Sequence, residues 1–370
     1  MENNNRVKCM FVTRKARGGI RTHLKTLANK LPKYNISPVI CAPKEDFEHT
    51  ISGGEFYHLP LEDGFKIKDY KNVFKLKELI KKTKPDIVHS HGYKASLIVA
   101  MAKSMVNFSW ITTIHNFQTS SIRRKTFKFF VKNILNRADK IQLVSNSLKR
   151  ELISVGIDEE KCTVLYNGIS LPSFHRPIDN RLSLPKGKLI GCIGRLNHDK
   201  GIDNFIYSVK YLYERYNNYF NSRRYYFLII GDGPEKEKLQ KLTWNLGLAS
   251  KIMFLGHRED VTDILKSLEV LCIPSRHEGL SITALEAMAS FCPVIAAKKG
   301  GLVELINHFE TGLLCPSDDP IKMGEAIMTL VKNQKIRRRI ALQAYINVIS
   351  NFNDEIMIKN VIDQYNGVKV

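Results

Sequence analysis

Residues 275–288 read Ser-Arg-His-Glu-Gly-Leu-Ser-Ile-Thr-Ala-Leu-Glu-Ala-Met and follow the apolar run Val270–Ile273 and Pro274. The apolar run predicts a strand, and the good helix formers late in the stretch predict a helix over Ile282–Ala289. The turn between them places backbone N–H groups at a helix N-terminus, where the helix dipole favours an anion. The stretch therefore predicts a strand–turn–helix unit whose turn binds a phosphate.

Two carboxylates flank the predicted anion site. Glu278 lies in the turn, and Glu286 lies inside the helix among the apolar residues Leu285, Ala287 and Met288. A pair of glutamates taken alone is most often solvated, because glutamate is usually exposed. In a mostly apolar helix, however, a charged residue needs a partner. Since carboxylates accept hydrogen bonds from hydroxyls, the combination indicates a site for a sugar phosphate or a nucleotide sugar.

Length and composition set the broad class of the protein. The chain has 370 residues, 44% of them hydrophobic and 25% charged, which predicts a globular protein of two domains. The N-terminus has no signal-peptide pattern, and no segment approaches about 18 consecutive apolar residues, so we expect a cytoplasmic protein without a membrane span. The scattered cysteines form no Cys-x-x-Cys pair and are expected to be free buried thiols: Cys9, Cys41, Cys162, Cys192, Cys272, Cys292 and Cys315.

The net charge of +21 is concentrated in the first half of the chain. Residues 1–170 contain 30 Lys and Arg against 15 Asp and Glu, whereas residues 171–370 contain 27 against 21. A basic half attracts polyanions such as nucleic acid, anionic lipid or phosphorylated substrates. The sequence has no aromatic-basic RNA-binding motif and no helix-turn-helix or zinc-finger spacing, so no nucleic-acid partner is expected.

Strand-like and helix-like segments alternate along the chain, which predicts an α/β protein with parallel sheets covered on both faces. Residues 168–187 lack periodicity, contain three prolines and are the best linker candidate. Two such domains facing each other would place a ligand cleft at the carboxyl ends of their strands. The predicted strands are Val7–Val12, Val39–Ala42, Ile87–His89, Trp110–Ile114, Ile141–Val144, Thr163–Leu165, Leu189–Ile193, Phe227–Ile230, Ile252–Leu255, Val270–Ile273 and Val294–Ala297.

Four further segments follow predicted strands and are glycine-rich or basic. Residues 14–20 read Arg-Lys-Ala-Arg-Gly-Gly-Ile, so that Gly18 and Gly19 let the backbone approach a phosphate at the start of a helix. In residues 193–201, Arg195 and Lys200 are placed to grip a diphosphate, with structural ion pairing as the competing interpretation. Glycine-containing turns at residues 231–234 and 299–304 also follow predicted strands. Because such turns recur at strand ends, we expect them to line one crevice.

Three histidines, His89, His91 and His115, lie at or near the ends of predicted strands. A strand-end histidine is more often a structural hydrogen-bonding group than a catalytic one. His115 is the strongest functional candidate, followed by His91 and then His89. No cysteine or carboxylate stands beside them at ligand spacing, so no metal site is expected.

Residues 121–137 combine phenylalanines with basic residues at helical spacing. One interpretation is a core-facing stripe of Phe127, Phe130, Val131 and Ile134 with a solvated basic face. The other is an interfacial helix that docks on anionic lipid, with Phe129 as the insertion point.

The ordered set of motifs resembles the family 4 glycosyltransferases, which have the GT-B fold of two Rossmann-like domains. The resemblance covers nearly the whole chain, and the ordered set is far more specific than any single motif. The matching residues are Gly18-Gly19, His91, His115, Val144-Ser145, Asn167-Gly168-Ile169, Gly194-Arg195-Leu196, Lys200-Gly201, Gly231-Asp232-Gly233, Glu278, Glu286, Gly300-Gly301, Glu304 and Gly312-Leu313-Leu314.

The resemblance implies a division of the chain and a reaction. Residues 1–170 would form an acceptor-side Rossmann-like domain, residues 171–353 a nucleotide-sugar-binding one, and the last helix, within 354–370, would pack back on the first. The reaction would be a retaining hexosyl or N-acetylhexosaminyl transfer from a nucleotide sugar, most often a UDP-sugar. The acceptor would be a glycan or a polyprenyl or other lipid-linked molecule of cell-surface polysaccharide or glycolipid synthesis. The enzyme would lie on the inner face of the cell membrane.

The resemblance also implies a role for each candidate residue. Arg195 and Lys200 would neutralise the donor diphosphate, Glu286 would bind the ribose, and Glu278 would bind a sugar hydroxyl. His115 would contact the sugar, and His91 is the candidate on the acceptor side. Electrostatic stabilisation of the leaving diphosphate would need no cofactor and no metal, in line with the absence of an Asp-x-Asp motif. The remaining donor-binding candidates are Gly18, Gly19, Gly231, Gly279, Leu280 and Ser281.

Two other functions remain open at this stage. A nucleotide-sugar epimerase on a related fold would need acid–base groups and no acceptor. A basic membrane- or nucleic-acid-binding protein that has lost catalysis would not need Arg195, Lys200, Glu278 and Glu286, whose presence argues against it. The donor sugar, the linkage and the oligomeric state depend on loop shapes that these motifs do not specify.

Overall fold

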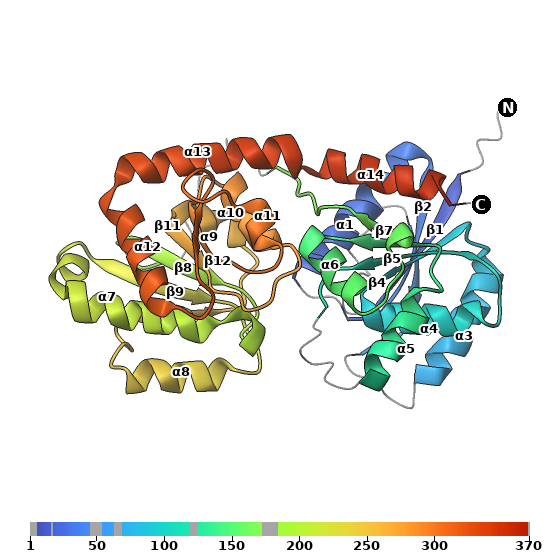
Figure 1. Cartoon of the computed structure of the whole chain (residues 1–370), viewed down its shortest axis with the longest axis horizontal. Coiled ribbons are helices and arrows are strands. Elements are labelled where there is room, and N and C mark those ends of the chain that lie inside the picture. The colour runs from blue at the N-terminus through green and yellow to red at the C-terminus, as the bar shows by residue number, and fades with distance from the viewer. Residues whose placement is uncertain are drawn as a thin grey trace. The chain divides into compact units, whose positions relative to one another are not determined.

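The computed structural model describes residues 6–15, 18–44, 54–62, 69–117, 125–171 and 184–368. The chain divides into two compact units (Figure 1). Unit 1 is Met1–Ile169 together with Asp354–Val370, and unit 2 is Ser170–Asn353. The boundary predicted between residues 170 and 171 lies one residue from this division.

The described part of unit 1 contains a seven-stranded sheet in the order β3-β2-β1-β4-β5-β6-β7. Every strand pair is parallel, as expected for strands connected through helices. The central strands are almost fully buried, which explains their continuous apolar sequences. The strands are β1 (Val7–Thr13), β2 (Ile36–Ala42), β3 (Glu55–His58), β4 (Ile87–His91), β5 (Ser109–Ile114), β6 (Lys140–Leu143) and β7 (Cys162–Val164).

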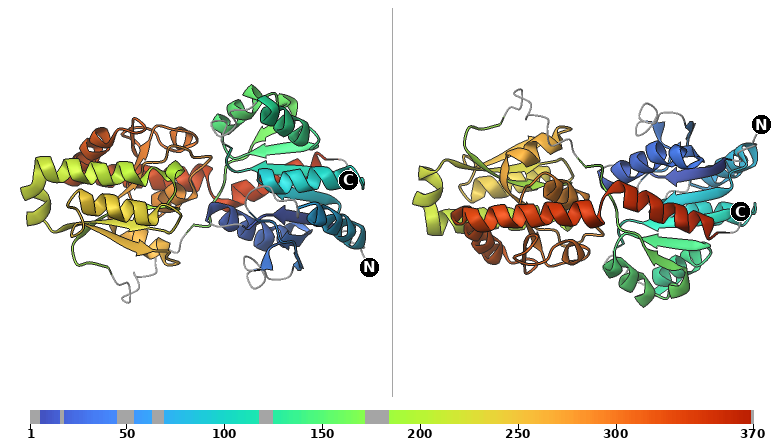
Figure 2. Two further views of the ribbon diagram at one scale, coloured as in Figure 1. Left: turned by 90° about the horizontal axis from the view of Figure 1, so that it is seen from below. Right: turned by 90° about the horizontal axis from the view of Figure 1, so that it is seen from above.

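Helices cover both faces of this sheet. The last helix, α14 (Asp354–Asn366), lies beside α1 (Gly19–Lys30) (Figure 2). It contributes Met357, Ile358, Val361 and Tyr365 to the core under β1 and β2. Lys30 also pairs with Asp354 at 2.6 Å. The remaining helices are α3 (Asp69–Thr83), α4 (Tyr93–Lys103), α5 (Lys125–Leu135) and α6 (Asn146–Ser154).

The described part of unit 2 contains a six-stranded parallel sheet in the order β10-β9-β8-β11-β12-β13. The strands are β8 (Lys188–Ile193), β9 (Tyr225–Ile230), β10 (Ile252–Gly256), β11 (Leu268–Ile273), β12 (Val294–Ala297) and β13 (Leu313–Cys315). Helices α7 and α12 pack together over one face, and α10 packs between α9 and α13. The helices are α7 (Ile202–Ser222), α8 (Lys236–Asn245), α9 (Val261–Ser267), α10 (Ile282–Ala289), α11 (Leu302–Leu305), α12 (Pro320–Lys332) and α13 (Gln334–Asn351).

Both sheets follow the same Rossmann-like strand order, so the predicted fold class is confirmed. The eleven predicted strands are all present, and β3 and β13 are two short edge strands that the sequence patterns did not reveal. In such sheets ligands bind outside the carboxyl ends of the strands, where the strand order reverses. The reversal lies between β1 and β4 in unit 1 and between β8 and β11 in unit 2. Within the described residues, no helix is long and apolar enough to cross a bilayer.

Candidate functional site

The loop between β11 and α10 carries Glu278 and ends at a capped helix. The Oγ atom of Ser281 accepts a hydrogen bond from the N–H of Ala284 at 3.3 Å, which fixes the first turn of α10. Among the described residues, the backbone N–H groups of Gly279, Leu280 and Ser281 have no acceptor. All three residues are buried. Three N–H groups without an acceptor thus lie at the positive end of a helix dipole, which suits an anion.

Lys200 and Glu278 meet at the point where the strand order of unit 2 reverses. Lys200 lies in the segment after β8, Glu278 lies in the segment after β11, and these strands are neighbours. The Nζ atom of Lys200 is 2.6 Å from Oε2 of Glu278. The side chain of Glu278 is 10% exposed and that of Lys200 is 29% exposed. The structure shows the ion pair of the competing interpretation of Lys200, and the contact to a diphosphate stays a prediction.

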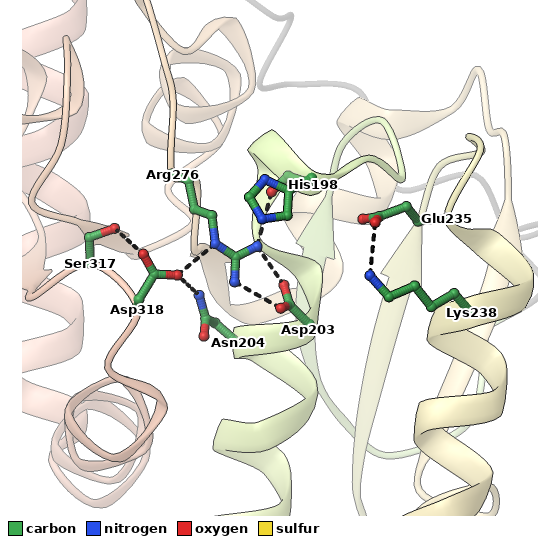
Figure 3. A network of polar contacts seen from close by, with 8 residues as sticks. All are labelled: His198, Asp203, Asn204, Glu235, Lys238, Arg276, Ser317 and Asp318. Carbon is green, nitrogen blue, oxygen red and sulfur yellow. Dashed lines mark hydrogen bonds and ion pairs between the residues drawn. The ribbon is translucent and has the colours of Figure 1, made fainter. Parts of the chain in front are cut away.

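Arg276 ties these two segments together. Its guanidinium donates two hydrogen bonds to Asp203 at 2.8 Å and one to the backbone oxygen of His198 at 3.0 Å (Figure 3). Its Nε donates to Asp318 at 2.6 Å, which also accepts from Asn204. The hydrogen bonds to Asp203 raise the pKa of Arg276 above its ordinary value. Burial alone would raise the pKa of Asp203, but Arg276 holds it below its usual range.

The backbone reinforces this connection at two glycines. Gly201 has a φ of +61°, and a Cβ there would lie 2.2 Å from the backbone oxygen of Pro274. Gly300 has a φ of +54°, and a Cβ there would lie 2.1 Å from the backbone oxygen of Glu278. The same oxygen accepts a hydrogen bond from the N–H of Gly301 at 3.1 Å. Only glycine allows this conformation and this approach, so the turns after β8 and β12 hold the loop that carries Glu278.

Glu286 is half-buried in α10, and its carboxyl group has no hydrogen bond or ion pair with any described residue. Burial raises the pKa of its carboxyl group to about 7. A carboxyl group without a partner inside an apolar helix is unfavourable for folding. Its presence is consistent with a ligand that supplies hydroxyl donors.

The other donor-side candidates lie at the same edge of the sheet of unit 2. Arg195 lies two residues after the end of β8, and its exposed side chain has no partner among the described residues. Gly231 follows β9 and donates its N–H to the backbone oxygen of Gly256 at 2.7 Å. Arg195, Gly231 and the Lys200–Glu278 pair thus follow β8, β9 and β11, at the carboxyl ends of three adjacent strands.

In unit 1, the glycine-rich turn lies where that sheet also reverses its strand order. Gly18 precedes α1 with a φ of +62°, and Gly19 begins the helix. Ala16 and Arg17 of the predicted turn lie outside the described residues. The position after β1 is the one expected for a phosphate-binding turn in a Rossmann-like sheet.

Four histidines lie together near this turn. His91 ends β4, His115 follows β5, and His23, which the sequence analysis did not single out, lies in α1. The Nδ1 atom of His91 is 3.2 Å from Nε2 of His115. Burial lowers the pKa of His23 to about 4 and holds those of His91 and His115 well below their ordinary value. The imidazoles are therefore neutral at pH 7, so His115 can exchange hydrogen bonds with a hydroxyl but cannot act as a cation.

His89, the weakest of the three histidine candidates, has a structural role in this fold. Its Nδ1 is 2.7 Å from the hydroxyl of Tyr365 in α14, and its Nε2 is 2.7 Å from Oγ1 of Thr113. Both ring nitrogens are thus occupied within unit 1. His89 connects the last helix to the central strands.

Sequence reasoning missed Arg276 and His23 as site residues. Arg276 lies within residues 275–288, but its partners Asp203 and Asp318 lie 73 and 42 residues away in the chain. No local pattern connects them. His23 lies four residues before the buried Leu27, so helical spacing alone could have placed it on the buried face of α1.

Helix α5 departs in part from the predicted core stripe. Val131 and Ile134 are buried, but Phe130 is 45% exposed and Phe129 is 68% exposed. Lys128 and Lys132 are exposed as well. Residues 121–124 and the side chains of residues 125–127, including Phe127, lie outside the described part.

Two family models match consecutive parts of the chain. The model for Glycosyltransferase Family 4 matches residues 17–172, and the model for Glycosyl transferases group 1 matches residues 176–346. The chain belongs to the family 4 glycosyltransferases. The protein is therefore an enzyme of this class.

Curated relatives of this glycosyltransferase include enzymes with named reactions. The chain is 28% identical over 318 residues to an Escherichia coli UDP-Gal:alpha-D-GlcNAc-diphosphoundecaprenol alpha-1,3-galactosyltransferase, covering 81% of this chain and 80% of that one. It is 27% identical over 320 residues to the capsular polysaccharide biosynthesis glycosyltransferase CapM of Staphylococcus aureus, covering 80% and 81%.

A solved structure confirms the fold of the glycosyltransferase. The Anabaena protein HepE, crystallised with UDP and glucose, aligns with a TM-score of 0.83 over 98% of this chain and 100% of its own. The sequences are 20% identical, so this likeness establishes the GT-B fold.

Proposed function

We propose that this glycosyltransferase transfers a hexosyl or N-acetylhexosaminyl group from a UDP-sugar, with retention of anomeric configuration, to a glycan or lipid-linked acceptor. The observation that carries the proposal is the Lys200–Glu278 pair at the strand-order reversal of unit 2, next to the unpaired N–H groups of Gly279, Leu280 and Ser281. Cationic and N–H donors would hold the diphosphate, and the adjacent carboxylate would hold a sugar hydroxyl.

In the proposed reaction, negative charge develops on the diphosphate as its bond to the sugar breaks. The guanidinium of Arg195, the ammonium of Lys200 and the helix N-terminus would stabilise that charge, and preorganised donors of this kind supply much of enzymatic rate enhancement. Glu286 would accept hydrogen bonds from the ribose hydroxyls. The cationic and N–H donors would balance the charge without a metal or a cofactor. In unit 1, the proposed roles are contacts of Gly18 and Gly19 with phosphate, of His115 with the sugar and of His91 with the acceptor.

Relatives support the choice of donor and acceptor. HepE was crystallised with UDP, and the Escherichia coli relative is named for a UDP-sugar donor and a diphosphoundecaprenol acceptor. CapM is named for capsular polysaccharide synthesis. We therefore propose a role in cell-surface polysaccharide or glycolipid synthesis, on the cytoplasmic face of the membrane.

The test is incubation of the purified enzyme with UDP- and GDP-sugars, with and without a polyprenyl-diphosphate sugar acceptor. We expect release of UDP that depends on the acceptor, and an axial anomeric linkage from an axial donor by NMR. An inverted product would contradict retention. A new sugar isomer formed without acceptor would instead identify an epimerase.

We also propose that α5 brings the enzyme to anionic lipid. The exposed Phe129 and Phe130 adjoin the exposed Lys128 and Lys132, which is the combination of an interfacial helix. Replacing both phenylalanines by serine should weaken co-sedimentation with phosphatidylglycerol vesicles, while transfer to a water-soluble acceptor stays unchanged. Equal sedimentation of the variant and the wild type would contradict this contact.

A further inference from the structure

Three histidines from three different elements converge in unit 1. His23 of α1, His91 of β4 and His115 after β5 each offer a ring nitrogen, and these atoms all lie within 4.8 Å of one another. The residues are 4%, 1% and 8% exposed, respectively. No carboxylate or thiolate belongs to this group.

The spacing of the three rings agrees with that of ligands around one metal ion. A tetrahedral ion with Zn–N bonds of about 2.0–2.1 Å holds its ligand nitrogens about 3.4 Å apart and the ring centroids about 5 Å apart. Nδ1 of His91 and Nε2 of His115 are 3.2 Å apart. The ring centroids are 5.5 Å apart for His23–His91, 4.9 Å for His23–His115 and 5.5 Å for His91–His115.

The hydrogen bonding of the rings gives a second, independent indication of a ligand. Within the described residues, neither nitrogen of His23 makes a hydrogen bond of normal geometry, and the amide oxygen of the neighbouring Asn167 makes none either. Leaving buried polar atoms unpaired is costly, and proteins keep such groups mostly where something else binds them. The neighbouring His89 differs, because Tyr365 and Thr113 occupy both its nitrogens.

We propose that His23, His91 and His115 form a binding site for a divalent transition-metal ion of the zinc class. Imidazole nitrogens suit Zn²⁺, Co²⁺, Ni²⁺ and Cu²⁺, whereas Mg²⁺ and Ca²⁺ require oxygen ligands. Three protein ligands leave a fourth position for water or a substrate oxygen. Without metal, one proton lies between Nδ1 of His91 and Nε2 of His115. When both atoms bind the ion, the ring that carried this proton holds it on its other nitrogen instead.

The consequence for catalysis rests on the function proposed above. If His115 contacts the sugar and His91 the acceptor, an ion on both rings competes with substrate. We therefore expect zinc to act as a reversible inhibitor of transfer. The ion-binding site itself does not depend on this consequence.

The test uses the full-length protein after treatment with a chelator. Isothermal titration with ZnCl₂, and visible absorption after addition of CoCl₂, are measured for wild type, His23→Leu and the control His257→Ala. His23→Leu removes both ring nitrogens at that position, and His257 is an exposed histidine of unit 2. We expect one tight equivalent and the bands of four-coordinate Co²⁺ in wild type and His257→Ala, and at least tenfold weaker binding in His23→Leu.

Four outcomes decide between the possibilities. Absence of tight binding in wild type overturns the site, and so does unchanged affinity in His23→Leu and in the second variant His23→Gln. Tight binding that depends on His23, together with zinc inhibition relieved in His23→Leu, supports both the site and its effect. Binding that depends on His23 without inhibition supports the site and contradicts the proposed contacts of His115 and His91.

Discussion

The ammonium of Lys200 lies 2.6 Å from the carboxylate of Glu278, although 78 residues separate them in the chain. This pair joins a group suited to a diphosphate with a group suited to a sugar hydroxyl. When no donor is bound, each charge neutralises the other, so neither stays buried and unpaired. A bound donor would replace this ion pair by two contacts, one between Lys200 and its diphosphate and one between Glu278 and its sugar.

Removing either charge should impair transfer strongly. We expect Lys200→Ala and Glu278→Ala each to lower kcat/KM by on the order of a hundredfold, because each removes a charged contact to the donor. The double variant should lose much less than the product of the two, since each single variant leaves the other charge unpaired. Steady-state kinetics with a fixed acceptor measure this. Activity of either single variant within a few-fold of wild type would exclude the assigned site.

Arg276 should act through the positions of Lys200 and Glu278. We expect Arg276→Ala to lower kcat by about tenfold or more and to lower the thermal unfolding midpoint. The reason is that its ion pairs with Asp203 and Asp318 hold the loop that carries Glu278. Arg276→Lys should restore stability better than activity, since lysine cannot form the bidentate contact.

The control for Arg276→Ala is Lys238→Ala, and both residues are labelled in Figure 3. Lys238 is 72% exposed and pairs with Glu235 at 3.0 Å. Exposed pairs contribute little to stability, so this variant should match wild type in both measurements. An equal loss in Lys238→Ala and Arg276→Ala would show that charge alone, rather than loop position, causes the effect.

Local sequence patterns predicted the helices and strands of this fold better than the side-chain contacts between them. Helix α10 was predicted at its observed bounds because Pro274, Gly279 and a run of helix formers delimit it. Edge strand β3 has only four residues and partial burial, so it lacks a recognisable pattern. The alternation of strands and helices predicted the fold class.

The side-chain contacts that the sequence did not predict join residues far apart in the chain. Asp318, which bonds to Arg276, follows β13, the strand that pairs with β12. Tyr365, which bonds to His89, lies in α14, the last helix of unit 1. Phe130 matched the helical spacing of a core residue but is 45% exposed, because spacing does not say which face of α5 finds a neighbour. Tertiary packing decides these cases.

Glu286 should make stability depend on pH in a direction opposite to that of a salt-bridged carboxylate. Its pKa is raised from 4.5 to about 7 by burial, so between these values the folded state holds a proton that the unfolded chain has released. The folded state therefore loses stability as pH rises through this window, by on the order of 1 kcal/mol or more. Glu286→Gln should remove the loss, which thermal unfolding midpoints at pH 5, 6, 7 and 8 would reveal.

Nucleotide binding should show the reverse dependence. The ionised carboxylate is the better acceptor for ribose hydroxyls, so the affinity of wild type for UDP should rise between pH 6 and pH 8. Glu286→Gln should bind UDP more weakly at pH 8 and with little dependence on pH. Calorimetry that found the same pH profile in both proteins would argue against a ribose contact.

Ser281 should be needed for both the stability of α10 and donor binding. Its hydroxyl caps the helix through Ala284, so Ser281→Ala should cost about 1 kcal/mol of stability. Because the cap also fixes the N–H groups of Gly279 and Leu280, the variant should bind UDP several-fold more weakly. Asn333→Ala removes the equivalent cap of α13, whose side chain accepts from Ile336 at 3.1 Å. It should lose a similar amount of stability and retain full UDP affinity. If both variants lost affinity equally, general destabilisation of unit 2 would explain the result, and the helix N-terminus would not be the anion site.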